Sequence, residues 1–507
     1  MKYAKSMCIA AMGLLVALAI PVSLAAQDHP THHYQYKLID LGTLGGPASF
    51  TGDQFANPGT MFLNNRGIDT GAADTSTSDP YYPNCFFPDC FVTHAFRWDR
   101  GALTDLGALP GGSSSTGVGI NARGWIAGYS QNGAIDPLTQ FPENRAVLWT
   151  GTQINDLGTI GGGYESVGLI VNKGGQVTGF ASNLVSDPFF GTQIRTFLWD
   201  KQHGMQDLGT LGGTDSPPCG NMTINDSGQV VGCSFTNSTV NPVTGLPTTD
   251  PFLWEKGTMT DLGTLGGTFG FPFSLNNQGQ VVGNSNLPGD LTFHPFLWDK
   301  KKGITDLGTL GGNNGQADQI NEAGDVVGKA DLTGSQTHDG FLWRKGRMTD
   351  LGTLPGDPCS RANWINEQRQ IVGNSSDCTN GLHALLWEDG GSPIDLNTLI
   401  PPNSSLQLTN ANNINERGEI AGSGVPAGCQ PTHVDTCGHT YLLIPCDDNH
   451  GDGGDCGEHA AGTAETTINN ATPTAQNPTA TTPQNATPGG LFAQPRARGY
   501  RTLRSGA

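Results

Sequence analysis

The stretch 252–267 reads FLWEKGTMTDLGTLGG, and nearly the same residues return at 296–312 as FLWDKKKGITDLGTLGG and at 341–354 as FLWRKGRMTDLGTL. The phrase DLG, which becomes DLN in its last copy, recurs along most of the chain. A self-similar period of this length predicts a repeat architecture in which each unit is one supersecondary motif. Its aspartate occupies eight positions, separated by 65, 51, 51, 54, 45, 44 and 45 residues: Asp40, Asp105, Asp156, Asp207, Asp261, Asp306, Asp350 and Asp395.

Each unit contains a second phrase, an apolar residue followed by Asn-x-x-Gly. An asparagine that begins a tight turn, with a glycine of positive φ at the end of the turn, indicates a β-hairpin when short β-rich runs flank it. The glycine is replaced once, by Arg369 in the seventh unit. The eight asparagines are Asn64, Asn121, Asn172, Asn225, Asn276, Asn321, Asn366 and Asn415.

Tryptophan marks a third repeated position, in the FLW phrase. Seven of the nine tryptophans lie there, which predicts that the indole rings pack between like units rather than stack on a ligand: Trp98, Trp149, Trp199, Trp254, Trp298, Trp343 and Trp387. A short glycine-containing turn leads from this phrase into DLG and indicates a second hairpin. Each unit therefore holds four short strands.

These strands predict the fold. No helical periodicity interrupts the pattern between residues 34 and 445, so the domain is all-β. Four strands in 44 to 54 residues is the size of one propeller blade. The chain opens on YKLIDLG and the last unit ends on HTYLLIP, so the first strand can complete the last blade. We predict an eight-bladed β-propeller of four-stranded blades closed by the N-terminal strand, with seven blades or an open β-repeat array as the alternative.

Together the three phrases DLGTLGG, IN..G..VG and HAFRW (94–98) resemble the HAF-repeat family of extracellular proteins. The resemblance covers about 410 residues, from 34 to 445. It implies a secreted, propeller-like repeat protein. It implies no particular activity and no catalytic residues.

Two kinds of repeated polar residue have structural explanations. His94, His294, His383 and His439 share one slot, but other units place Arg or Asp there, which argues against a common metal ring. We expect these residues to cap the start of a strand. We expect the aspartates of the DLG phrase to cap turns by accepting backbone N–H groups.

The ends of the chain differ in composition from the repeats. Residues 1–25 carry two lysines, an apolar run and small residues before Ala25, which predicts a secretory signal peptide, with a membrane anchor as the alternative. The repeat propeller is assigned to 26–446, an acidic Gly/Asp linker to 447–460, and a disordered Thr/Pro/Asn-rich tail with a basic C-terminus to 461–507. The predicted location is extracellular or cell-surface, with the periplasm possible, and without a transmembrane segment in the mature chain.

Ten cysteines remain after Cys8, which lies in the apolar N-terminal run. An even number in an exported chain predicts disulfide bonds. The cysteines fall into close neighbours, so we predict local pairing: Cys85 with Cys90, Cys219 with Cys233, Cys359 with Cys378, Cys429 with Cys437, and Cys446 with Cys456.

The net charge of the chain limits the classes of ligand that we expect it to bind. Its formal net charge is −19, and nucleic-acid binding needs clustered Lys and Arg, so we expect no nucleic-acid partner. No cofactor is expected. A weak calcium candidate lies at Asp448 and Asp452, but the segment lacks the closing glutamate of a calcium loop, which favours a plain acidic linker. We also expect a monomer.

One connection varies in length from unit to unit, and it carries the candidate binding residues. Between the VVG and FLW phrases it takes 23, 17, 16, 18, 11, 11, 10 and 17 residues, so five units are enlarged on one rim. Insertions on one face often mark the binding face of a repeat array. The aromatic residues of these loops are Tyr81, Tyr82, Phe86, Phe87, Phe91, Phe141, Phe189 and Phe190. They either contact a ligand or fold back to cover blade edges.

From these observations we predict a non-catalytic binding scaffold that uses the enlarged loops to hold an extracellular protein, a polysaccharide or an envelope component. No nucleophile elbow, zinc-protease or phosphate-binding motif is present, so an enzyme is not the favoured interpretation. The alternative is a carbohydrate-active enzyme, a hydrolase or a lyase, on the same ring. An enzyme predicts two or three converging carboxylates, or a Tyr/His/Arg group, at one mouth of the propeller.

Overall fold

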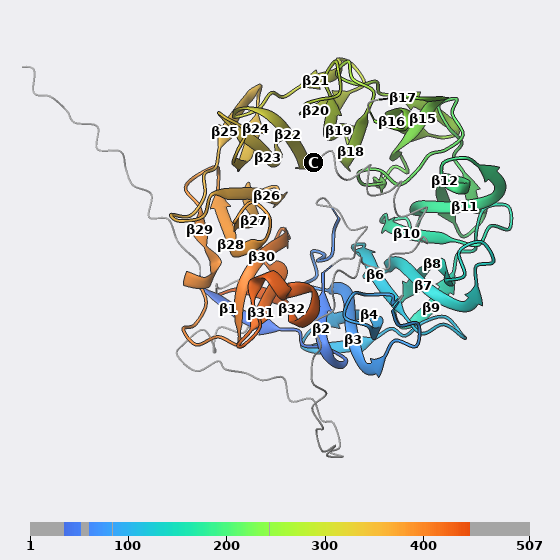
Figure 1. Ribbon diagram of the computed structural model, residues 1–507. Helices are drawn as coiled ribbons and strands as arrows, with labels where there is room; N and C mark the ends of the chain where they lie inside the picture. Colours follow the sequence, from blue (N-terminus) through green and yellow to red (C-terminus); the bar gives the residue numbers. More distant parts are fainter. Residues whose placement is uncertain (1–34, 52–59, 84, 243, 447–507) are drawn as a thin grey trace, which may run out of the picture.

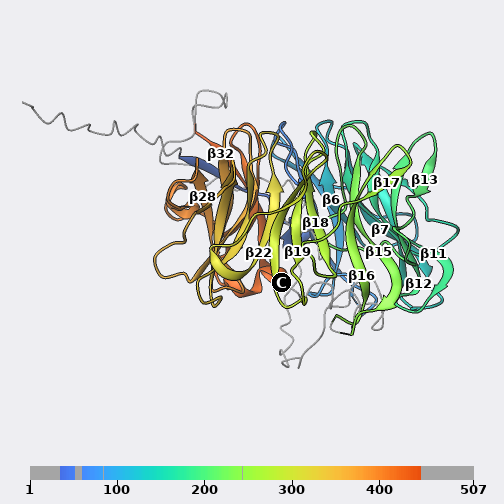
Figure 2. The same cartoon turned by 90° about the horizontal axis from the view of Figure 1, so that it is seen from above.

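A computed structural model describes residues 35–51, 60–83, 85–242 and 244–446. They form eight four-stranded antiparallel sheets arranged around a ring, an eight-bladed β-propeller, which confirms the predicted fold (Figure 1). Turned by 90°, the ring is a thick disc (Figure 2). Helix in the described ranges is limited to α1 (Val434–Cys437) and the single 3-10 turns η1 (Leu396–Thr398) and η2 (Pro431–His433).

The strands of each blade are given from the innermost outward. Blades 1 to 4 are β2 (Gly45–Phe50), β3 (Asp69–Ser78), β4 (Phe91–Asp99), β5 (Ala102–Asp105); β6 (Ser115–Ile120), β7 (Ile126–Ile135), β8 (Pro142–Thr150), β9 (Gln153–Asp156); β10 (Ser166–Val171), β11 (Val177–Asp187), β12 (Gly191–Asp200), β13 (Gly204–Asp207); β14 (Thr223–Ile224), β15 (Val230–Val240), β16 (Pro247–Glu255), β17 (Thr258–Asp261).

Blades 5 to 8 follow in the same order. They are β18 (Gly270–Leu275), β19 (Val281–Asn286), β20 (Phe293–Asp299), β21 (Gly303–Asp306); β22 (Gly311–Ile320), β23 (Val326–Leu332), β24 (His338–Arg344), β25 (Arg347–Asp350); β26 (Cys359–Ile365), β27 (Gln370–Ser376), β28 (Gly381–Glu388), β29 (Ile394–Asp395); β30 (Leu406–Ile414), β31 (Ile420–Pro426), β32 (His439–Pro445), β1 (Tyr36–Asp40).

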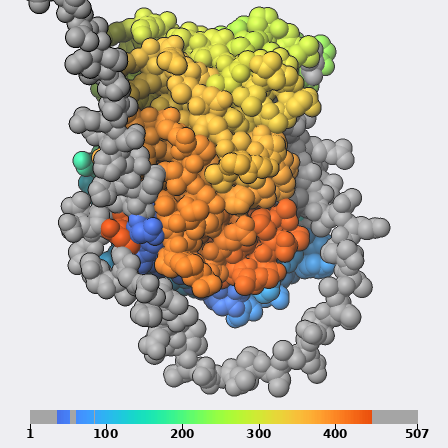
Figure 3. All heavy atoms as spheres, turned by 90° about the vertical axis from the view of Figure 1, so that its left-hand side faces the viewer, coloured from blue at the N-terminus to red at the C-terminus, as the bar shows by residue number. Residues whose placement is uncertain are grey.

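The N-terminal strand closes the ring. β1 pairs antiparallel with β32, from Tyr36 opposite Pro445 to Asp40 opposite Tyr441. Figure 3 shows this blue strand beside the orange last blade. Closure by the first strand removes a free sheet edge that would otherwise expose unpaired backbone groups.

The repeated asparagines begin the predicted hairpin turns between the first and second strands of each blade. Asn276 is typical, since its Oδ1 accepts the backbone N–H groups of Gln278 and Gln280. Gly279, at the end of that turn, has a φ of 76°, and its counterparts in six other blades also have a positive φ. In blade 7 Arg369 adopts a φ of 62° instead, and its Nε donates to Asp389 over 2.6 Å.

The same asparagines also join neighbouring blades. Each Nδ2 group donates to the backbone oxygen of the corresponding asparagine in the next blade, over 2.8 to 3.3 Å. The eighth bond, from Asn415 to Asn64, returns to the first blade, so the hydrogen bonds form a closed ring. The sequence predicted the turn but not the bond between blades.

The aspartates of the DLG phrase are turn caps, as expected. Each accepts the backbone N–H of the residue two positions on, as Asp306 does from Gly308 over 2.8 Å. The four repeated histidines were expected to cap strand starts; their observed contacts are instead pairs with aspartates. His294 Nδ1 contacts Asp306, and equivalent pairs join His94 to Asp105 and His439 to Asp40, whereas His383 contacts Asp357.

Tryptophan packs at the contact between blades. Trp149 is fully buried with Leu106 and Leu109 of the preceding blade, and its Nε1 donates to the oxygen of Leu106 over 3.2 Å. Trp387 repeats the arrangement with Leu351 over 2.9 Å. Packing of this kind accounts for the repeated position of the indole in seven of the eight units.

Four of the predicted disulfides are formed: Cys85–Cys90, Cys219–Cys233, Cys359–Cys378 and Cys429–Cys437. The pairing of Cys446 with Cys456 involves a residue outside the described ranges, as do the predicted signal peptide, linker, tail and calcium candidate. Among the described residues no helix is long and apolar enough to cross a membrane.

Candidate functional site

The enlarged connections lie on the rim opposite the asparagine ring, because each joins the far ends of the second and third strands. Three of the four enlarged connections in blades 1 to 4 begin with the dipeptide Asp-Pro, which was not used in the sequence-based prediction. The aspartates are Asp79, Asp136 and Asp187. These carboxylates accept backbone N–H groups of their own loops, as Asp187 does from Phe189 and Phe190. The loops are therefore built around capped turns.

The loop aromatics do not gather on one exposed surface. Phe87 and Phe190 are buried, with Phe190 only 1% exposed, and Phe86 and Phe189 are half-buried against the same core as Phe190. The remaining four differ in exposure: Tyr82 is 76% exposed, while Tyr81, Phe91 and Phe141 are half-buried.

Phe86, Phe189 and Phe190 join an apolar cluster formed by residues of blades 2 to 5. Phe86 packs on Tyr129 with ring centroids 5.5 Å apart, and Phe189 meets Phe235 edge-on at 5.4 Å. The cluster also contains Val118 from β6 and Leu169 from β10. On this half of the ring the long loops thus cover apolar inner strands.

The other half of the ring is polar at the equivalent positions. Three residues before each repeated asparagine, the inner segment carries an apolar residue in blades 1 to 5 and a polar one in blades 6 to 8: Met61, Val118, Leu169, Met222 and Phe273, then Asp318, Asn363 and Asn412. In β22, β26 and β30 the register shifts at this residue, so each of the three polar residues is the extra residue of a β-bulge. Val118, Leu169 and Phe273 occupy the same bulge in blades 2, 3 and 5, so the blades differ in the side chain and not in the backbone.

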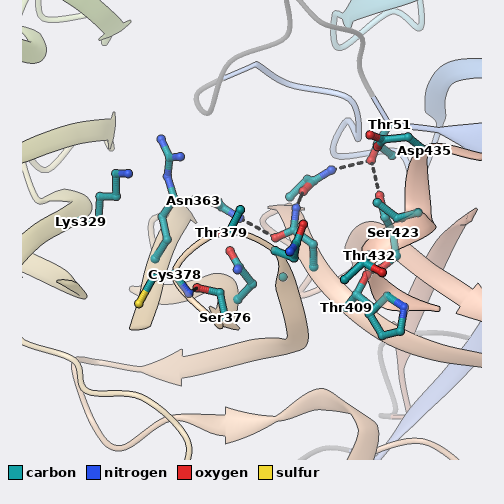
Figure 4. A pocket seen from close by; sticks show the side chains of 18 of the residues that line it. Thr51, Lys329, Asn363, Ser376, Cys378, Thr379, Thr409, Ser423, Thr432 and Asp435 are labelled. Carbon is teal, nitrogen blue, oxygen red and sulfur yellow. Dashed lines mark hydrogen bonds between the residues drawn. The ribbon is translucent and has the colours of Figure 1, made fainter. Parts of the chain in front are cut away.

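A cavity of about 520 Å³ lies on this polar half. Its walls come from blades 6, 7 and 8, from α1, and from Thr51, Thr60 and Phe62 of blade 1. This volume falls within the ~300–1,000 Å³ range of small-molecule sites. In Figure 4 Lys329 lies on one side of the cavity, and Thr51, Asp435 and Ser423 lie on the other.

One wall of the cavity carries three basic side chains, Lys329 on β23, His338 at the start of β24 and Arg361 on β26. Burial and the nearby Arg361 guanidinium lower the pKa of Lys329 to about 8, although Asp318 and Asp331 oppose that shift. Burial and the charges of Lys329 and Arg361 lower the pKa of His338 to about 4, so its ring is neutral near pH 7. The described residues offer the Lys329 ammonium no hydrogen bond or ion pair.

Arg361 is held by a buried carboxylate of the neighbouring blade. Its Nε and Nη2 donate to Asp318 over 2.7 and 2.8 Å, and the side chain of Asp318 is fully buried. Gln316 donates to the same carboxylate over 2.6 Å. A bidentate pair of this kind fixes the plane of the guanidinium. The contacts of Arg361 with described residues leave the donors of its Nη1 for a ligand.

Amide and hydroxyl groups line the cavity beyond Arg361. Asn363 Nδ2 donates to Asn410 Oδ1 over 2.9 Å, Asn410 donates to Asn412, and Asn412 donates to Thr51. The Thr51 and Ser423 hydroxyls lie 3.2 Å apart. We call these five residues the amide strip. It crosses from blade 7 to blades 8 and 1.

The cavity wall holds few acids. Asp435 on α1 is the one carboxylate among the described residues that line it. No group of three His, Cys, Asp or Glu residues in the described ranges could hold a metal ion. A glycosidase of the usual type needs two carboxyl groups flanking the bond. The wall instead suits an anionic ligand and proton transfer by a nitrogen base.

Neither a protein-family model nor a curated protein sequence matches this chain. Solved structures similar to it include a puromycin-hydrolyzing peptidase of Mycobacterium tuberculosis (11% identity, 76% of this chain, 62% of that chain, TM-score 0.40) and an acylaminoacyl peptidase of Pyrococcus horikoshii (10%, 75%, 58%, 0.39). The β-propeller domain of the Trilobed protease of Pyrococcus furiosus is also similar (9%, 69%, 96%, 0.42). This chain spans about three fifths of the length of the first two.

These comparisons contradict the predictions of a non-catalytic binding scaffold and of a protein that is not an enzyme. The similar structures named above are two peptidases and the β-propeller domain of a protease, so the two predictions are not kept. At these identities and TM-scores the similarity identifies no reaction, so the chemistry below is argued from the cavity alone. Of the Tyr/His/Arg group predicted for an enzyme, the described wall carries His338 and Arg361, with Lys329 in place of a tyrosine.

The cavity could not be recognised from the repeated residues, because its basic side chains are not repeated. Lys329, His338 and Arg361 each lie in a single unit and match no local motif. The signal that could have found them is the change from apolar to polar at one repeat position in blades 6 to 8.

Proposed function

We propose that this protein is a carbohydrate lyase that cleaves an anionic, uronate-containing polysaccharide by β-elimination. The observation that carries the proposal is the pairing, on one wall of the cavity, of a lysine without a carboxylate partner and an arginine fixed by a buried one. Elimination next to a carboxylate needs a base for the carbon-bound proton and a cation for the negative charge that develops on the carboxylate.

In this mechanism Arg361 binds the sugar carboxylate, which acidifies the hydrogen on the adjacent carbon. Neutral Lys329 takes that proton, the electron pair forms a carbon–carbon double bond, and the glycosidic oxygen on the next carbon leaves. The leaving oxygen accepts a proton, which the Lys329 ammonium can return, so the reaction consumes no water or cofactor. His338 contributes an uncharged ring beside the base.

Lysine bases in enzymes have pKa values near 7 to 8 because burial and neighbouring cations destabilise the charged form. Lys329 has both causes. A hydrolase is less well supported, since the described wall of the cavity lacks the second carboxylate that the usual hydrolytic mechanism requires.

The test is to incubate the protein with polygalacturonate, alginate and other uronate polymers and to follow the ultraviolet absorbance of the conjugated unsaturated product. We expect Lys329→Met to lower kcat by about 10²-fold or more. Lys300→Met, which removes an exposed lysine on an outer turn of blade 5, is the control and keeps full activity. New reducing ends without the absorbance change, or full activity in Lys329→Met, would reject the elimination mechanism.

The proposal includes the location at which the protein acts, which is outside the cell. Four disulfides suit an oxidising compartment. Together with the N-terminal segment and the family resemblance described above, they support secretion, where extracellular polysaccharide is available as substrate.

A further inference from the structure

The fold of the propeller does not require polar residues at the positions of the amide strip. Inner strands of the same fold place Val118, Leu169 and Phe273 where blades 7 and 8 place Asn363 and Asn412. A buried or half-buried amide costs free energy unless it is hydrogen-bonded, whereas the apolar residues at the same repeat position gain free energy from burial. The apolar units are thus an internal control showing that the polar choice is not dictated by the fold.

The strip is ordered and retains hydrogen-bonding capacity. Each amide group has two N–H donors and an acceptor oxygen. Asn363 uses both of its donors, on Asn410 and Ala411, and keeps acceptor capacity at Oδ1. The bonds from Asn410 to Asn412 and from Asn412 to Thr51 each occupy one donor. Residues that hold one another in place while keeping further donors and acceptors form a pre-organised site.

The chemistry of the strip differs from that of the basic wall. Asn363, Asn410, Asn412, Thr51 and Ser423 carry no charge, so the strip matches hydroxyl groups rather than a second carboxylate. It begins at Asn363, two residues after Arg361 in β26, and extends toward Ser423 across the cavity (Figure 4). A ligand that contacts both regions has an anionic unit at one end and hydroxyl groups at the other.

We propose that the amide strip is a second sugar subsite, which binds the hydroxyl groups of a unit beyond the cleaved bond and makes the protein selective for oligomers over dimers. The inference rests on the proposed lyase function, since Lys329 and Arg361 define where the reacting unit lies. Binding energy from a remote unit is then used at the reacting centre, as occurs in other enzymes with extended substrates.

The experiment compares a dimer and a hexamer of the uronate that the wild-type protein cleaves best. Asn412→Leu gives blade 8 the residue that blade 3 has at this repeat position, and Asn412→Ala removes the amide without filling the cavity. For the hexamer we expect each variant to lower kcat/KM about tenfold, the effect of about one hydrogen-bonded amide. For the dimer we expect a change of less than about twofold.

Asn183→Leu is the matched control, because Asn183 lies on the same rim outside the cavity, and it should leave both substrates unaffected. Equal losses for dimer and hexamer in Asn412→Ala, or no loss for either, would overturn the subsite while leaving the lyase proposal intact. If Asn412→Leu proves unstable in thermal melts, Asn412→Ala decides the question. A wild-type protein inactive on all uronate polymers would instead reject the proposed function itself, and the subsite with it.

Discussion

Asn415 Nδ2 lies 3.0 Å from the backbone oxygen of Asn64, a residue 351 positions earlier in the chain, and this bond closes a ring that links all eight blades. The Oδ1 atom of Asn415 accepts two N–H groups of its own turn, and its Nδ2 also contacts the buried Glu419. One side chain thus shapes a hairpin and joins the two ends of the propeller.

Removing that side chain should destabilise the protein at the point of closure. We expect Asn415→Ala to lower the free energy of unfolding by about 1–3 kcal/mol, because it leaves buried polar groups without partners. Asn321→Ala is the control, since Asn321 makes the same bond between two internal blades over 3.3 Å. Thermal unfolding gives the stabilities, and hydrogen exchange should rise in β1 and β32 only for Asn415→Ala. Equal exchange in both variants would contradict a special role for the closing bond.

A second prediction concerns an acid pair in blade 4. Asp250 takes the slot that His294 takes in blade 5, and it faces Asp261 instead of forming a His–Asp pair. Burial and the Asp261 carboxylate raise the pKa of Asp250 to about 7, from 3.8. Between pH 3.8 and about pH 7 the folded protein keeps a proton on Asp250 that the unfolded chain releases. The stabilisation that comes from this proton is therefore full below pH 3.8 and is lost as the pH rises through about 7.

Asp250→His should therefore weaken the fall of the melting temperature between pH 5 and pH 8, because an imidazole can donate to Asp261. The reverse exchange, His294→Asp, should steepen the fall by creating an acid pair with Asp306, like those of Asp250 with Asp261 and Asp339 with Asp350. Asp74, Asp215 and Asp339 also have raised pKa values, of about 8, 7 and 6, and give both variants the same background. Parallel melting curves against pH for the two variants would refute the assignment.

The third prediction separates buried from exposed loop aromatics. Phe190 is 1% exposed and stacks near Phe235, with centroids 6.2 Å apart. Replacing it by alanine should lower the free energy of unfolding by about 3–5 kcal/mol, as for other large buried aromatics. Tyr82→Ala, at a position that is 76% exposed, should change it by less than about 0.5 kcal/mol. Denaturant titration measures the free energy of unfolding of both variants. Similar losses in the two variants would show that the loop does not cover the core.

Repetition made much of the fold predictable. The blade count, the strand order, the closing strand and four disulfides follow from spacing, because eight copies of each phrase report the same local structure. The bond from Asn415 to Asn64 was not predictable, since a hairpin signal contains no information about the neighbouring hairpin. The partners of His94 and His294 were missed for a similar reason: the DLG aspartate pairs across a strand, not along the chain.

The candidate site was not predictable by the same means, because it lies where the units differ. Arg361 and Asp318 come from different blades, and only the ring brings them together. The lowered pKa of Lys329 depends on burial between β22 and β24 and on charges from blade 7, none of which a sequence pattern encodes. Four of the five enlarged connections lie in blades 1 to 4, whereas the cavity lies beside the short connections of blades 6 and 7 and the enlarged connection of blade 8.

The last prediction is the pH dependence of the proposed reaction. The charged or titratable groups near Lys329 are Arg361 and His338, which disfavour or share its proton, and Asp318 and Asp331, which favour the ammonium. Because the base must be neutral, kcat/KM for a uronate polymer should rise with pH and level off above about 8. Asp331→Asn removes a charge that raises the pKa of Lys329, so the rise should shift to lower pH while the plateau stays the same. Asp377→Asn, which changes an exposed carboxylate on the β27–β28 turn, is the control and should not move the curve. A profile that falls with pH over this range, or an Asp331→Asn curve displaced to higher pH, would show that Lys329 acts in its charged form and not as the base.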